Sequence, residues 1–60
     1  MQIIKIQKED PDWTSAGYEV TLNGHVIAAN VSHAMALRVA YDAADLLESR
    51  GELDFQIIKG

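Results

Sequence analysis

The sequence contains no cysteine and only one proline among its 60 residues. The absence of cysteine excludes disulfide bonds, thiolate metal sites and a cysteine nucleophile. Cations are scarce as well, because five Lys and Arg stand against nine Asp and Glu, which gives a formal net charge of −4. Five scattered cations do not form the basic patch that neutralises phosphates, so we expect the chain not to hold nucleic acid through its phosphate backbone.

Long hydrophobic runs are also missing. No apolar stretch approaches the ~20 residues of a membrane span, and the first residues lack the apolar segment of a signal peptide. We therefore expect a soluble, cytoplasmic protein that does not contact membranes. A hydrophobic content of 48% indicates a folded chain rather than a disordered one. The length predicts one small domain over residues 1–60, stabilised by a well-matched core or by self-association.

The clearest element is a helix from Ser32 to Arg50. Ser32 is a typical N-cap residue, and Gly51 can take the left-handed conformation that ends a helix. Between these marks the sequence has no Gly or Pro and is rich in Ala and Leu, which are strong helix formers. The stretch therefore predicts the only helix of the chain.

This predicted helix has an alanine-rich side, a polar side and an apolar edge. At 100° per residue, the alanine-rich side is suited to lie close to a sheet, because small side chains let the helix axis approach. That side contains Ala36, Leu37, Ala40, Ala43, Ala44 and Leu47. The polar side contains Arg38, Tyr41, Asp42, Asp45, Glu48 and Ser49, with Arg38 spaced to pair with Asp42. The edge contains Met35, Val39 and Leu46, which we assign to the border of the core or to a second interface.

The remaining segments read as strands. Residues 1–8 predict a strand with Ile4 and Ile6 inward, and Asn23-Gly24 predicts a two-residue type I′ turn within residues 18–29. That turn would pair Leu22 with His25, Val20 with Ile27 and Tyr18 with Ala29, all on one face. A last strand at 53–59 would turn Leu53, Phe55 and Ile57 inward.

These elements predict an α+β fold of β-β-β-α-β order, with one helix on one face of a four-stranded sheet. Because the helix returns the chain across the sheet, we expect the last strand beside the first and parallel to it, in the order 3-2-1-4. Placement of the last strand beside the third is the alternative. The other face of the sheet would carry Ile3, Val26 and Ile58 among polar residues.

Residues for chemistry are sparse. His25 and His33 are the only imidazoles, and with no cysteine a metal site would need both of them plus carboxylates brought together by the fold. The four glycines form no phosphate-binding motif, and no residue pair has the spacing of a nucleophile and its base. We therefore expect no metal, no cofactor and no enzymatic activity.

Two surfaces are candidates for binding. The first is the acidic helix face, where an exposed aromatic beside carboxylates is typical of a protein interface, although a merely solvated face gives the same pattern; its residues are Arg38, Tyr41, Asp42, Asp45 and Glu48. The second is the helix edge of Met35, Val39 and Leu46, a candidate for self-association into a homodimer. Trp13, the single tryptophan, is predicted to fold over an end of the core or to anchor a partner.

The hairpin, the alanine steps of the helix from Ala36 to Ala43, and the ending from Gly51 to Gly60 resemble short uncharacterised bacterial and phage proteins of β-β-β-α-β type. This resemblance implies a fold without an activity. The first half, with Ile3-Ile4-Lys5-Ile6 and Gly17-Tyr18-Glu19-Val20, is similar to small antitoxins of the HicB kind. The Asp-Leu-Pro-Gly-Cys-like turn of those antitoxins has no counterpart here, so none of their functional residues is carried over.

The sequence therefore favours a non-catalytic, acidic interaction protein that binds a protein partner. By analogy, such chains suit phage or mobile-element inhibitors of host systems, including anti-CRISPR-like proteins. The alternative is a nucleic-acid-binding or antitoxin-like module that uses the open sheet face, with contacts from Lys5, Lys8 and Lys59.

Overall fold

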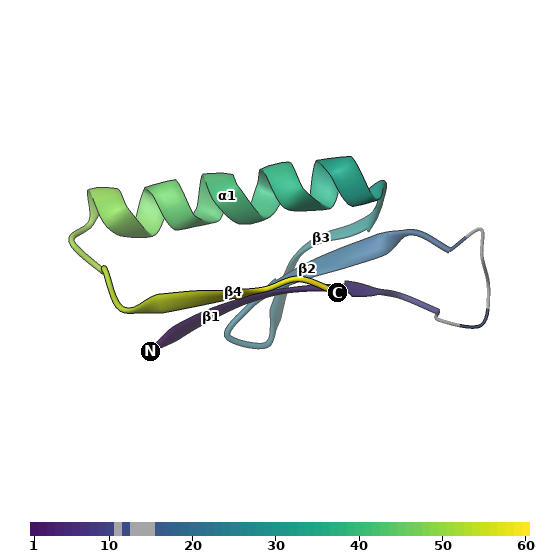
Figure 1. Cartoon of the computed structure of the whole chain (residues 1–60), viewed down its shortest axis with the longest axis horizontal. Coiled ribbons are helices and arrows are strands. Elements are labelled where there is room, and N and C mark those ends of the chain that lie inside the picture. The colour runs from purple at the N-terminus through teal and green to yellow at the C-terminus, as the bar shows by residue number, and fades with distance from the viewer. Residues whose placement is uncertain (11, 13–15) are drawn as a thin grey trace.

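The computed structural model of the chain describes residues 1–10, 12 and 16–60. Strand β1 (Gln2–Lys8) is followed by β2 (Tyr18–Leu22), β3 (His25–Val31), the helix α1 (His33–Ser49) and β4 (Phe55–Ile58). The four strands form one sheet in the order β3-β2-β1-β4, and α1 lies along one face of it (Figure 1). The predicted α+β fold and strand order are therefore confirmed. Strand β4 is parallel to β1, while the β1–β2 and β2–β3 pairs are antiparallel.

The helix ends are formed as the sequence predicts. The Ser32 side-chain oxygen accepts a hydrogen bond from the Met35 backbone N–H at 3.1 Å, which satisfies one free donor of the first turn. At the other end Gly51 has a φ of +79°, and the Gly51 and Glu52 backbone N–H groups donate to the carbonyls of Glu48 and Leu47. This pair of bonds is the Schellman arrangement, and it directs the chain back toward the sheet.

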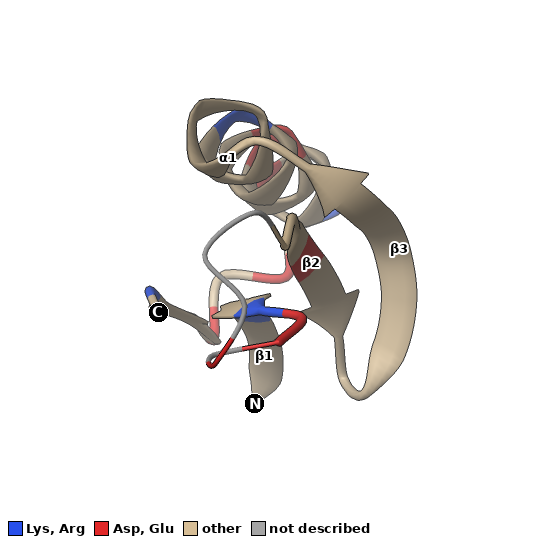
Figure 2. Cartoon of the chain, turned by 90° about the vertical axis from the view of Figure 1, so that its right-hand side faces the viewer, with Lys and Arg blue, Asp and Glu red and all other residues tan. Residues whose placement is uncertain are grey.

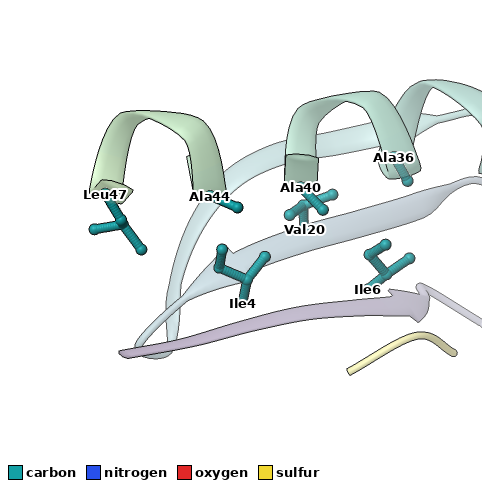
Figure 3. Packing of buried hydrophobic residues seen from close by; sticks show 7 residues of the cluster. All are labelled: Ile4, Ile6, Val20, Ala36, Ala40, Ala44 and Leu47. Carbon is teal, nitrogen blue, oxygen red and sulfur yellow. The ribbon is translucent and has the colours of Figure 1, made fainter. Parts of the chain in front are cut away.

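The core lies between the alanine-rich side of α1 and the centre of the sheet. Ile4, Ile6 and Val20 point from the strands toward the helix, and small side chains receive them there (Figure 3). Ala36 and Ala40 are completely buried, and Ala44 and Leu47 are each 5% exposed. Alanines at these positions let the helix backbone approach the sheet, so the isoleucines fill the space between the two layers.

The hairpin turn is as predicted, but its register is not. Asn23 and Gly24 both have positive φ, as a type I′ turn requires, and Leu22 pairs with His25. Beyond that, Val20 pairs with Ala28 and Tyr18 with Val31, because β3 carries an extra residue at two places. The predicted Val20–Ile27 and Tyr18–Ala29 pairs are therefore wrong. The residues of β3 that pack on the core are Ala28 and Val31, while Ile27 is 43% exposed.

The second irregularity in β3 coincides with Asn30, whose φ of +56° is a left-handed conformation that Asn tolerates well. Gly17 approaches this position so closely that a Cβ on it would lie 2.8 Å from the Asn30 Cα. The Asn30 backbone N–H donates to the Glu9 Oε1 atom at 2.6 Å, and the Glu9 backbone N–H donates to the Gly17 carbonyl. Gly17 is thus required for close backbone packing at this corner.

The last strand is shorter than predicted. It begins at Phe55, and Phe55 and Ile57 pack on the core as expected. Leu53, however, is 74% exposed, so its predicted inward position is wrong. The physical reason is that the helix-ending turn extends through Glu52, and the first backbone hydrogen bond with β1 is the one from the Gln2 N–H to the Asp54 carbonyl. Leu53 therefore precedes the segment that the sheet holds.

Candidate functional site: the outer surface of the helix

The acidic helix face is exposed to solvent over its whole length. Arg38, Asp42, Asp45 and Glu48 are all exposed, and Tyr41 is 46% exposed. Figure 2 views α1 nearly end-on and marks its charged positions above the sheet. The regular structure of α1 alone positions these side chains, because residues three or four apart share one side of a helix.

The charges of this face are not neutralised internally. Among the described residues, the one ion pair joins the Met1 amino group to Asp54 at 3.7 Å. The spacing of Arg38 and Asp42 permits an i,i+4 ion pair, but the two side chains do not form one. Two exposed, flexible side chains lose rotamer entropy when they pair, and an exposed pair gains little in return. The acidic face thus keeps its negative charge available for an external cation.

Tyr41 is the one aromatic side chain of this face, and it has a specific neighbour. The Lys59 Nζ atom lies 5.3 Å from the centroid of the Tyr41 ring, a cation–π distance. This contact brings the C-terminal end of the chain against the helix. Sequence reasoning missed it, because residues 41 and 59 lie in different elements and only the packing of β4 beside β1 brings them together.

The position of Lys59 also affects the alternative hypothesis, in which Lys5, Lys8 and Lys59 contact nucleic acid on the open sheet face. Lys5 is on that face, opposite Thr21 and Ile58 in the strand register, and is exposed. Lys59 instead contacts Tyr41 on the helix. The three lysines proposed to contact nucleic acid therefore do not form one cluster on the open face. Of the apolar residues there, Ile3 and Ile58 are each 39% exposed and Val26 is 57% exposed.

The helix edge divides into exposed and partly buried positions. Met35 is 46% exposed and Leu46 is 53% exposed, whereas Val39 is partly buried and packs against the core. Val39 therefore belongs to the border of the core, and Met35 and Leu46 extend from it into solvent. The third candidate, Trp13, lies outside the described residues.

The two histidines lie apart in the sheet and helix. His33 meets the ring of Tyr18 edge to face at 4.9 Å, and His25 is exposed beside the hairpin turn. Within residues 1–10, 12 and 16–60, no group of three or more His, Cys, Asp or Glu side chains is placed to hold a metal ion. No helix in that part of the chain is both long and apolar enough to cross a membrane.

Comparison of the chain with protein-family models, with curated proteins and with solved structures finds no match.

Proposed function

We propose that the protein is a small acidic interaction module that binds a basic surface of a protein partner through the outer face of α1. The observation that supports this proposal is the exposure of Tyr41 beside Asp42, Asp45 and Glu48, with no ion pair to these carboxylates within the described residues. An exposed tyrosine supplies contact area at low entropic cost, and the carboxylates supply electrostatic complementarity to a cationic partner.

The charge pattern suggests the kind of partner. Carboxylates along one helix face present negative charge in a row, as a phosphate backbone does, so they fit a basic surface that otherwise holds nucleic acid. Occupation of such a surface would exclude the nucleic acid and inhibit the partner. This mode of action suits an inhibitor of a host system encoded by a phage or mobile element, a class assigned here by analogy.

The test compares two variants of equal net charge. Asp45→Asn/Glu48→Gln removes two carboxylates from the helix face, and Asp12→Asn/Asp54→Asn removes two from elsewhere, so each changes the net charge from −4 to −2. Each variant and the parent chain is immobilised, and protein captured from a nuclease-treated bacterial lysate is quantified at increasing salt. We expect the helix variant to bind about tenfold more weakly than the parent, and the control variant to bind as the parent does.

If both variants captured less protein by the same amount, only the net charge would matter. If both captured as much protein as the parent, the helix face would not be used. Either result rejects the proposed site. Tyr41→Ala is a second test of whether this face binds the partner, and it leaves the net charge unchanged. Its capture should fall too, because a tyrosine at the centre of an interface contributes more binding energy than the charges around it.

A further inference from the structure

A row of apolar side chains follows one edge of α1, between the core and the acidic face. Met35, Val39 and Leu46 are spaced by four and seven residues, so they fall within about 40° of each other around the helix. Met35 and Leu46 are about half exposed, and Val39 joins them to the core. Spacings of four and seven are those of the seam between two paired helices.

We propose that this row is the interface between two copies of the chain, which pair through α1 in antiparallel orientation. The proposed partner of this row is a second copy of the chain, because a two-fold symmetric interface brings the same patch of each copy together. The row runs about 16 Å along α1, from 11 residues at about 1.5 Å each, which is long enough for a helix–helix contact.

Charge selects the orientation. Asp42 occupies the seam position between Val39 and Leu46. Parallel pairing would place Asp42 against Asp42 of the second copy, and two like charges at one position are destabilising. Antiparallel pairing instead places Met35 opposite Leu46 and Val39 opposite Asp42, so no position meets itself.

Arg38 completes the antiparallel arrangement. It is exposed, follows the border of the same row, and has no ion pair within the described residues. In antiparallel pairing Asp42 of one copy lies opposite Val39 of the other, next to Arg38. The arrangement therefore brings Arg38 of each copy beside Asp42 of the other. The two-fold symmetry of the dimer makes this ion pair twice.

The small core gives a reason for association. The largest completely buried side chains are Ile4, Ile6 and Val20, and the buried positions of the helix are mostly alanine. A chain of 60 residues with a core of this size gains from any partner that binds only its folded form. The interface uses the helix edge and takes Arg38 and Asp42 from the acidic helix face, and it leaves Tyr41, Asp45 and Glu48 of that face free. It does not depend on the proposed binding of another protein.

The first test is the mass of the full chain in solution by sedimentation over a range of concentrations. We expect the parent to shift from 6.6 kDa toward twice that mass as concentration rises. Leu46→Asp should raise the dissociation constant at least about tenfold, because it places a charge in the seam. The matched control is Leu53→Asp, at an exposed leucine outside the helix, which should leave the dimer unchanged. Circular dichroism confirms that both variants are folded.

Charge exchange tests the orientation. Arg38→Asp and Asp42→Arg should each weaken the dimer, and the double variant Arg38→Asp/Asp42→Arg should restore it. Because the chain has no cysteine, single substitutions also report the orientation directly. Met35→Cys mixed with Leu46→Cys should form an intermolecular disulfide on oxidation, whereas each variant alone should not.

Three results would overturn the proposal. The parent could stay monomeric at the highest soluble concentration, or it could dimerise equally well with Leu46→Asp. Alternatively, Met35→Cys alone could cross-link as readily as the mixture, which would indicate parallel pairing.

Discussion

The two sides of α1 differ in the size and the exposure of their side chains. The side facing the sheet carries Ala36, Ala40, Ala44 and Leu47, none more than 5% exposed. The side facing away carries large residues, with Tyr41 46% and Leu46 53% exposed. Small residues are thus placed where the helix lies close to the sheet, and large ones where about half of the side chain is left exposed. Exposed large side chains gathered in one region are typical of interaction sites, which is why our proposals place the contacts on this outer surface.

Leu46 and Leu47 sharpen this comparison, because they are adjacent and chemically identical. Leu47→Ala should destabilise the protein by about 2–5 kcal/mol, since it removes buried atoms and leaves a cavity in the core. That is a large share of the about 3–9 kcal/mol typical of a chain this short. Urea unfolding followed by circular dichroism measures the difference.

Leu46→Ala is the control, and it should change stability by less than about 0.5 kcal/mol in the monomer. Both variants are compared at low protein concentration, where self-association contributes least. Equal losses at the two positions would mean that Leu46 is as buried as Leu47, and the division between the inner and outer sides would be wrong.

The second comparison adds volume instead of removing it. Ala40 is completely buried and points toward the sheet (Figure 3), so Ala40→Leu should cost about 1–3 kcal/mol as the helix is pushed away from the strands. Ala34→Leu inserts the same side chain at an exposed position of the same helix and should be neutral within about 0.5 kcal/mol. Thermal unfolding of both variants gives the result. A neutral Ala40→Leu would show that closeness between helix and sheet is not the reason for the alanines.

The fold could be predicted because its signals are local and agree with one another. Ser32 and Gly51 bound the helix, Asn23-Gly24 sets the turn, and the helical return places β4 beside β1. The register of β3 could not be predicted, because the extra residues there depend on tertiary packing. The one local hint is Asn30, a residue type that accepts the left-handed conformation found there.

For the candidate site, the sequence predicted which residues share one helix face but not the contacts that their side chains make. Helical periodicity correctly places Tyr41, Asp42, Asp45 and Glu48 on one exposed face. It also permits an Arg38–Asp42 pair, which does not form, since spacing allows an exposed ion pair without making it favourable. The contact of Lys59 with Tyr41 joins two ends of the molecule and follows from the packing of β4, so no local pattern could indicate it.

The smallest expected effect concerns this contact, which links the outer side of α1 to the rest of the fold. A double-mutant cycle with Tyr41→Leu and Lys59→Met should give a coupling of about 0.5–1 kcal/mol, the range of an exposed cation–π contact, in urea unfolding. The same cycle with Lys5→Met should give none, because Lys5 lies on the opposite face of the sheet. Zero coupling in both cycles would mean that Lys59 does not stabilise the folded chain through the ring. The Tyr41 ring would then make no stabilising contact with Lys59, and the whole exposed part of that ring would remain available to a partner.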